Sequence, residues 1–228
     1  DHCERLAHLS VRLGEQMGLD DDELTALRRG GYLHDLGKVG IPDAVLLKPG
    51  PLTDDEWKIM KGHVEIGVEI CSPLRSLRPV LPLIRHHHER FDGSGYPDGL
   101  AGEDIPLLAR VFQLVDVYDA LTNDRCYRKA LSRDEAIAVM ADETSRGYWD
   151  PRIYGEFVGM IQVEESEAVS SSRNTEISWV CRRQSHWRPH GHCEGRWRWV
   201  RFDASIERST CVPAPIVSPK RTPYWRQL

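Results

Sequence analysis

Long apolar runs, paired cysteines and a hydrophobic leader are absent from this sequence. None of its apolar runs approaches the roughly 18 to 20 residues that a membrane helix needs, and residue 1 begins no signal-like segment. The six cysteines are scattered without C-x-x-C spacing, which argues against a disulfide framework and against a thiolate zinc site. We therefore expect a globular, cytoplasmic protein whose cysteines are ordinary thiols.

Charge and periodicity divide the 228-residue chain into two parts. The formal net charge is −5, but residues 164–228 carry +4 and residues 1–163 carry −9. Apolar residues recur at helical spacing in the first part, and no segment shows the period-two alternation of a half-buried strand. We predict an all-α domain over residues 1–163, followed by a separate tail.

Start and stop signals mark the predicted helices. The spacing of Leu6, Leu13 and Met17 predicts a first helix that stops at Gly18. A second helix is expected to end near residue 35. Capping boxes predict helix starts at residues 53–56 and 132–135, and the first of these helices is expected to continue to about Cys71. Residues 105–122 are almost entirely apolar, which predicts a buried helix.

The helical spacing stops after Val163. Residues 164–228 contain five of the seven tryptophans and many arginines but one lysine, with no sustained period. We favour an irregular tail, disordered or non-native. Two other interpretations are a basic, aromatic strip for single-stranded nucleic acid and a zinc site. The residues available for such a zinc site are Cys181, His186, His190, His192 and Cys193.

Histidines and aspartates recur at intervals that helices could bring together. His34 and Asp35 stand side by side at a helix end, but alone such a pair is more often a helix cap than a ligand pair. His2 could equally be a surface residue, and His63 a core residue with satisfied hydrogen bonds. Asp116 is more informative, because an unpaired carboxylate in an apolar helix costs several kcal/mol to bury and requires a cation or strong donors. Asp119, on the same helix face, would orient a ligand histidine.

Three longer motifs make the pattern specific. The segments "LHDLGKVGIPDAVLLKPGPLTDDEW", "HHERFDGSGYPDGLAGEDIPLLAR" and "DVYDALTNDRCYRKAL" closely resemble the HD-GYP family of HD-domain phosphohydrolases, over residues 1–162. The resemblance implies an HD-domain helical bundle with a centre of two or three divalent first-row metal ions, iron or manganese. It also implies metal-assisted hydrolysis of the bacterial second messenger cyclic di-GMP to pGpG, with further cleavage to GMP left open.

The resemblance also assigns roles to individual residues. The implied metal ligands are His2, His34, Asp35, His63, His87, His88 and Asp116. Asp35 would bridge two ions, and Lys38 would lie near the scissile phosphate. Arg125 and Arg128 would hold the other phosphate. His86 stays outside the ligand set. The Glu ligand of trinuclear members would precede residue 1, so we expect an N-terminally truncated domain.

Other functions and partners stay open at this point. The chain could hydrolyse another nucleotide, as related HD proteins do, or could bind cyclic di-GMP or a partner protein without turnover. A diguanylate cyclase or another regulatory protein is a candidate partner, and a homodimer is compatible with the sequence. We expect no membrane association, and nucleic acid is not a favoured partner.

Overall fold

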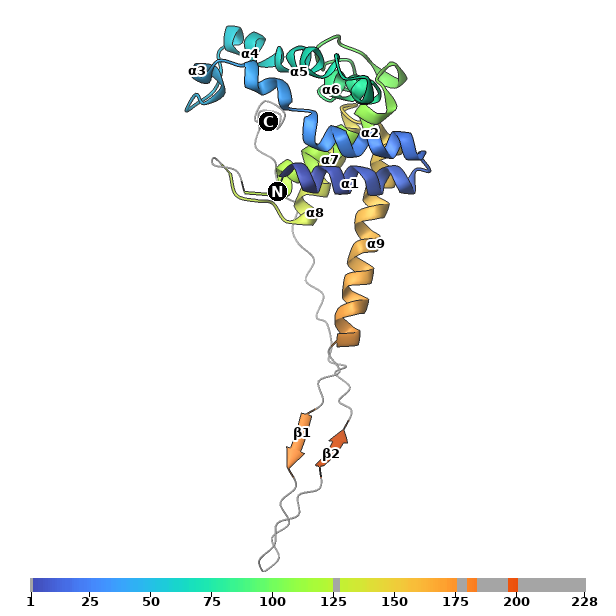
Figure 1. Ribbon diagram of the computed structural model, residues 1–228. Coiled ribbons are helices and arrows are strands. Elements are labelled where there is room, and N and C mark those ends of the chain that lie inside the picture. Colours follow the sequence, from blue (N-terminus) through green and yellow to red (C-terminus); the bar gives the residue numbers. More distant parts are fainter. Residues whose placement is uncertain (1, 125–127, 176–179, 184–196, 201–228) are drawn as a thin grey trace, which may run out of the picture. The chain divides into compact units, whose positions relative to one another are not determined.

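The computed structural model describes residues 2–124, 128–175, 180–183 and 197–200 (Figure 1), with side chains described as far as residue 163. None of the helices in these ranges is long and apolar enough to cross a membrane. Residues 1–161 form one compact unit, and the described residues from 162 onward belong to a second.

The first unit is built from helices and short 3-10 turns. In order these are α1 (His2–Gln16), α2 (Asp21–Leu33), η1 (Leu36–Gly40), α3 (Asp43–Leu46), α4 (Asp54–Lys61), α5 (His63–Cys71), η2 (Arg75–Val80), α6 (Leu81–His86), η3 (Gly102–Asp104), α7 (Leu107–Thr122), α8 (Arg133–Ser145) and the first part of α9 (Pro151–Thr175). The prediction of an all-α bundle is confirmed for the described residues of this unit.

Most of the expected helix signals operate as predicted, with one correction. Thr53 and Ser132 both form capping boxes, at the starts of α4 and α8. The single helix expected up to Cys71 is wrong, because α4 and α5 are separate and meet at Gly62. Glycine is a poor helix former, and Gly62 is the C-cap of α4 and the N-cap of α5.

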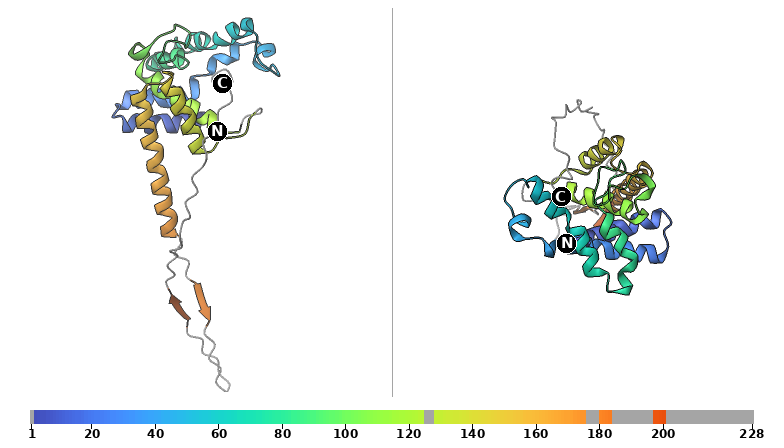
Figure 2. Two further views of the ribbon diagram at one scale, coloured as in Figure 1. Left: turned by 180° about the vertical axis from the view of Figure 1, so that it is seen from behind. Right: turned by 90° about the horizontal axis from the view of Figure 1, so that it is seen from above.

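The buried centre of the first unit is α7. Its residues from Ala109 to Leu121 are all buried, as the apolar sequence predicted. The views in Figures 1 and 2 show α1 and α2 lying side by side, and both helices pack against α7. On another side of α7 lies α6, which also contacts α5, and α5 in turn contacts η1. The segments that carry the predicted ligands are therefore all neighbours of α7 or of one another.

Regular structure continues beyond the boundary predicted at residue 163. Helix α9 runs to Thr175, and strands β1 (Val180–Arg183) and β2 (Trp197–Val200) pair antiparallel. Residues 160–188 contain neither glycine nor proline, so no helix-breaking residue ends α9 at residue 163. The expectation of an irregular segment directly after residue 163 is therefore corrected for these ranges. His186, His190, His192 and Cys193 lie outside the described residues.

Candidate metal centre

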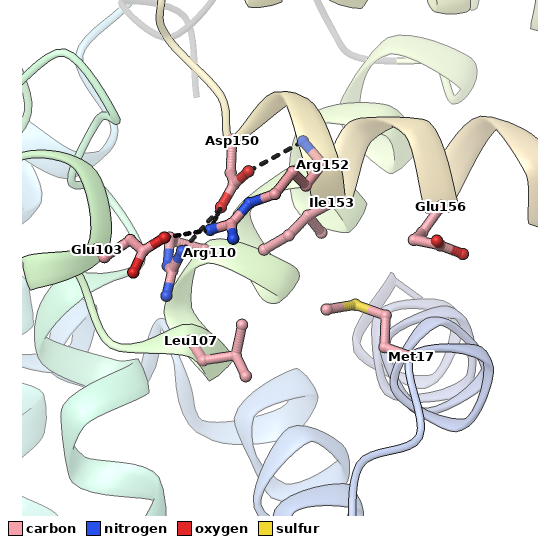
Figure 3. Close-up of a pocket in the computed structure, with 8 residues that line it drawn as sticks. All are labelled: Met17, Glu103, Leu107, Arg110, Asp150, Arg152, Ile153 and Glu156. Carbon is pink, nitrogen blue, oxygen red and sulfur yellow. Dashed lines mark hydrogen bonds and ion pairs between the residues drawn. The ribbon is translucent and has the colours of Figure 1, made fainter.

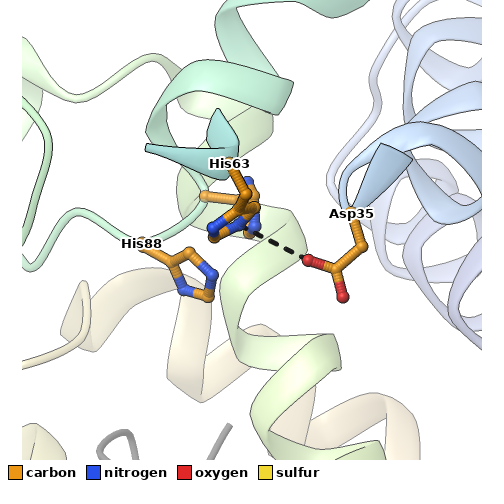
Figure 4. A group of neighbouring side chains, drawn as sticks. Asp35, His63 and His88 are labelled. Carbon is orange, nitrogen blue, oxygen red and sulfur yellow. Dashed lines mark ion pairs between the residues drawn. The ribbon is translucent and has the colours of Figure 1, made fainter. Parts of the chain in front are cut away.

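Four of the predicted ligands form a first group. Asp35, His63, His87 and His88 each offer one ligand atom, and these atoms all lie within 4.8 Å of one another. Asp35 follows α2, His63 begins α5, and the two adjacent histidines follow α6. Figure 4 shows Asp35, His63 and His88 pointing toward one another from these separate segments.

The other three predicted ligands form a second group. His2, His34 and Asp116 also bring their ligand atoms within 4.8 Å of one another. His2 begins α1, His34 caps the end of α2, and Asp116 lies in the middle of α7. Nε2 of His2 is 3.9 Å from Oδ1 of Asp116. The structure therefore brings all seven predicted ligands together in two groups.

Asp35 joins the two groups through its two carboxylate oxygens. Oδ1 lies 3.5 Å from Nε2 of His63, and Oδ2 lies 3.4 Å from Nε2 of His34. One oxygen therefore faces each group. A carboxylate in this position can bind two neighbouring ions at once.

In three of the imidazoles a hydrogen bond occupies Nδ1, and Nε2 has no hydrogen-bond partner among the described residues. Nδ1 of His34, His63 and His87 lies 2.8 to 3.2 Å from the main-chain carbonyl oxygen of a residue three or four positions earlier in the chain. Nε2 of each of these residues, and Oδ1 of Asp35, is buried without a hydrogen-bond partner in the described structure. Buried polar atoms are rarely left unsatisfied, and imidazole with carboxylate is a donor set that suits divalent first-row metals. These residues therefore fit a metal centre.

Burial also keeps most of these imidazoles in the neutral form that binds metal. It lowers the pKa of His63, and it lowers the pKa of His87 and His88 well below the usual value. For Asp35, burial acts to raise the pKa, but the neighbouring His34 imidazole, 3.4 Å away, and the charge of Lys38 lower it well below its usual range. Burial raises the pKa of Asp116, and a cation beside this carboxylate would stabilise its charged form.

His2 is held by Asp119, for which the sequence indicated the role of orienting a ligand histidine without saying which one. Oδ2 of Asp119 lies 2.7 Å from Nδ1 of His2, which directs Nε2 toward the second group. Arg5 donates to the same carboxylate, from Nε at 2.5 Å and from Nη2 at 3.1 Å. Sequence reasoning missed Arg5, although its place one helical turn after His2 would have been a signal.

A close backbone contact fixes the position of the His-Asp segment. Gly37, in η1, packs directly on α5: a Cβ atom at this position would lie 1.8 Å from the carbonyl oxygen of His63 and 2.5 Å from the amide nitrogen of Gly67. Only glycine fits such an approach. It brings Asp35 and Lys38 next to the start of α5.

The predicted cationic residues are placed differently from one another. Nζ of Lys38 donates to Oδ2 of Asp35 at 2.7 Å, so the lysine lies at the centre. Arg128 donates from Nη1 to the carbonyl oxygens of Leu121 at 3.0 Å and Lys129 at 2.9 Å, and from Nη2 to that of Ala120. It thereby caps the end of α7. Arg125 lies outside the described residues.

His86 belongs to a third group, with Glu89 and Asp98. Both oxygens of the Glu89 carboxylate accept main-chain N–H groups, and Asp98 accepts two hydrogen bonds from Arg85. These acids are thus already bonded within the protein. The group holds a loop, and His86 is outside the metal centre, as expected.

A surface pocket of about 370 Å³ lies elsewhere in the first unit (Figure 3). Four of its five charged side chains pair with one another: Arg110 lies 2.7 Å from Asp150, and Arg152 lies 2.6 Å from Glu103. The pocket shares no residue with the metal-ligand groups. We assign it no ligand.

Comparison with known proteins agrees with this geometry. The HD domain family matches residues 1–153. The cyclic di-GMP phosphodiesterase response regulator RpfG of Xanthomonas campestris pv. campestris is 44% identical over 165 residues, which cover 71% of this chain and 43% of that protein. The chain belongs to the HD-GYP family of HD-domain proteins.

Two further relatives bear on substrate and fold. The 3'3'-cGAMP-specific phosphodiesterase 2 of Vibrio cholerae serotype O1 is 40% identical over 156 residues, covering 67% of this chain and 28% of that protein. The solved structure of Bd1817, an HD-GYP-type protein from Bdellovibrio bacteriovorus, aligns with a TM-score of 0.56 at 22% identity, over 71% of this chain and 51% of its own. This HD-GYP chain spans less than half the length of the two curated relatives, and the Bd1817 likeness concerns the fold alone.

Proposed function

We propose that this HD-GYP chain is a metal-dependent phosphodiesterase that hydrolyses cyclic di-GMP to pGpG. The observation that carries the proposal is the pair of ligand groups joined by Asp35, with unpartnered buried atoms facing one another across the centre. The name of RpfG, a cyclic di-GMP phosphodiesterase, supports the same substrate. Further cleavage of pGpG to GMP stays a prediction.

The centre would hold two divalent ions, one in each group, with iron or manganese as the proposed metals. His63, His87 and His88 would bind one ion, His2, His34 and Asp116 the other, and Asp35 both. When bound, such ions activate a water molecule and neutralise charge on phosphoryl oxygens. A third ion would need a ligand beyond these seven residues.

The chain's own residues would position the substrate. Lys38 lies beside Asp35, where its ammonium group can meet the scissile phosphate. For Arg125 and Arg128 the proposed contact with the second phosphate rests on the family resemblance. Arg128 would have to exchange some of its carbonyl contacts at the end of α7 for that phosphate.

A second candidate function differs only in the substrate. The 40% identity with a 3'3'-cGAMP-specific phosphodiesterase favours a mixed cyclic dinucleotide as an alternative substrate. Binding of a cyclic dinucleotide without turnover is the other alternative. A cytoplasmic location, a homodimer and a diguanylate cyclase or regulatory partner stay predictions.

One experiment separates these functions. The protein is loaded with iron or manganese without oxygen, its metal content is measured, and cyclic di-GMP or 3'3'-cGAMP is added. We expect pGpG from cyclic di-GMP, and a loss of at least about 100-fold in rate for Asp35→Ala. Asp55→Ala removes an exposed aspartate and serves as the matched control. Faster turnover of 3'3'-cGAMP than of cyclic di-GMP would favour a mixed cyclic dinucleotide as the substrate. Binding of either compound without product would favour a binding protein without turnover. Equal turnover by Asp35→Ala would disprove the assigned chemistry.

A further inference from the structure

His88 is oriented differently from the other histidines of the first group. His63 and His87 are each held by a hydrogen bond from Nδ1 to a main-chain carbonyl oxygen. Among the described residues, neither ring nitrogen of His88 has such a bond. Instead the ring of Tyr96 stacks on it, with ring centroids 4.8 Å apart and an angle of 27° between the planes. The rings of His87 and His63 also lie near, with centroids 4.0 and 5.2 Å from that of His88, but they are tilted and edge-on, so Tyr96 supplies the near-parallel face against this imidazole.

Tyr96 belongs to a loop that folds back over its own start. Its amide N–H donates to the carbonyl oxygen of His88 at 3.2 Å, so both the backbone and the ring of Tyr96 contact His88. Nζ of Lys61 lies 5.1 Å from the centroid of the tyrosine ring. The ring of Tyr96 is thus held against a metal ligand by its own backbone and by its stacking contact.

Glu89 holds this loop from inside. Its side chain is fully buried. Oε1 accepts the amide N–H of Asp98 at 2.8 Å, and Oε2 accepts that of Leu100 at 3.1 Å. A Cβ atom on Gly95 would lie within 2.5 Å of main-chain atoms of Glu89 and Arg90, so glycine is required for the loop to pass this close. Nδ1 of His86 lies 3.6 Å from Oε1, which places this histidine at the loop anchor.

We propose that Tyr96 and Glu89 are positioning residues of the metal centre: Tyr96 fixes the orientation of the ligand His88 by stacking, and Glu89 holds Tyr96 there. The inference rests on the metal centre of the proposed function and does not depend on turnover. Groups that orient a metal ligand commonly contribute 10- to 100-fold to metal affinity.

The test for Tyr96 compares an aromatic with an aliphatic replacement. Binding of Co²⁺ is followed by its visible absorption, which reports the geometry of the bound ion, for wild type, Tyr96→Phe and Tyr96→Leu. We expect Tyr96→Leu to bind Co²⁺ about 10- to 100-fold more weakly with an altered spectrum. Tyr96→Phe retains a stacking ring and should resemble wild type in both. Equal affinity and an unchanged spectrum for Tyr96→Leu would overturn the proposal.

The test for Glu89 uses a signal from His88 itself. A ring stacked on an imidazole shifts the NMR signals of its C–H protons, and Tyr96→Leu identifies the shifted His88 signals. We expect Glu89→Gln to reduce this shift and to weaken Co²⁺ binding, while Glu103→Gln, on the exposed pair with Arg152, changes neither. A Glu89→Gln protein with an unchanged shift and unchanged Co²⁺ affinity would contradict the proposal. If wild type binds Co²⁺ without cleaving a cyclic dinucleotide, the proposed activity fails and this inference stands.

Discussion

At the scale of single residues, the centre depends on how each imidazole is held. The ring nitrogen that points away from the centre is bonded to a carbonyl oxygen in His34, His63 and His87, and to a carboxylate in His2. Such bonds fix the tautomer, so that Nε2 carries the lone pair. Contacts within the protein thus fix the tautomer and orientation of these imidazoles before an ion binds.

Asp119 gives the sharpest test of this arrangement. We expect Asp119→Asn to weaken binding of the ion at His2, His34 and Asp116 by about 10- to 100-fold, because an amide carries no charge for His2 and Arg5. Calorimetric metal titration would measure the two ions as separate steps, and the ion at the first group should be retained. Asp55→Asn is the control. Two unchanged binding steps would mean that Asp119 serves stability alone.

The ligand residues could be predicted from the sequence because three long motifs resemble the HD-GYP family, and this resemblance implies which histidines and aspartates bind metal. Asp116 was predictable because a carboxylate stands within an apolar helix. The role of Glu89 was not, since its two partners, Asp98 and Leu100, are backbone groups in a loop whose path the sequence does not reveal. Arg5 was missed because its partner Asp119 is distant in the chain.

At the scale of elements, close backbone contacts decide where the ligands stand. The contact of Gly37 with α5 links the His-Asp segment to His63. Similarly, the break at Gly62 makes His63 the first residue of α5. The sequence predicted one helix here because the apolar spacing continues through residue 62, and periodicity does not register a break of a single residue.

The Gly37 contact predicts a large effect for a small substitution. Gly37→Ala places a methyl group against the main chain of α5, where no flexible side chain can move aside. We expect it to lower the free energy of unfolding by about 3 kcal/mol or more and to weaken metal binding at the first group. Gly155→Ala is the matched control, because nothing lies near its added Cβ in α9, and there we expect a gain of about 0.5 to 1 kcal/mol. Denaturant unfolding measures both, and similar values for the two variants would refute the steric argument.

A buried ion pair joins α7 to the start of α9. Asp150 accepts from Nη1 of Arg110 at 2.7 Å and from the amide N–H of Arg152 at 3.0 Å. Burial acts to raise the pKa of Asp150, but these hydrogen bonds lower it below its usual value. A carboxylate with a lowered pKa contributes stability above its unfolded pKa of about 3.9, and this contribution is lost as the pH falls through the folded pKa.

Asp150→Asn should therefore destabilise in a pH-dependent way. At pH 7 we expect a loss of about 3 kcal/mol, because Arg110 is left buried without its counter-charge. The difference between wild type and variant should shrink below about pH 4, where the carboxylate takes up a proton first in the unfolded chain and then, at its lowered pKa, in the folded protein. Urea unfolding at several pH values measures it. Asp55→Asn, on an exposed pair, should change stability by less than about 0.5 kcal/mol. A difference that stays constant down to pH 3 would contradict the assigned charge effect.

At the scale of the whole molecule, the two parts of the chain differ in how far sequence could predict them. The first unit follows helical periodicity almost throughout, and its fold class was predicted correctly. The continuation of α9 and the pairing of β1 with β2 were not predicted. Pairing of two short strands depends on contacts between segments that are separate in the chain, and the alternation of Trp197, Arg198 and Trp199 in β2 is too short to predict it.

The ligands of the first unit come from five separate segments, so metal binding should stabilise that unit as a whole. His2 belongs to α1, His34 and Asp35 to the end of α2, His63 to α5, and Asp116 to α7, while His87 and His88 follow α6. An unfolded chain cannot gather these groups, so ions bind the folded state. At free metal 100-fold above the dissociation constant, each ion adds about 2.7 kcal/mol.

Removal of metal with EDTA should consequently lower the melting temperature by about 5 to 10 °C for each ion lost, at the usual 2 to 4 °C per kcal/mol for a chain of this size. Calorimetry of the metal-loaded protein, with and without chelator, measures the change. In Asp35→Ala the drop should be much smaller, since the carboxylate shared by both groups is gone, while Asp55→Ala should behave like wild type. A melting temperature that EDTA leaves unchanged, in protein whose metal content was verified beforehand, would show that the ions do not join these segments in the folded state.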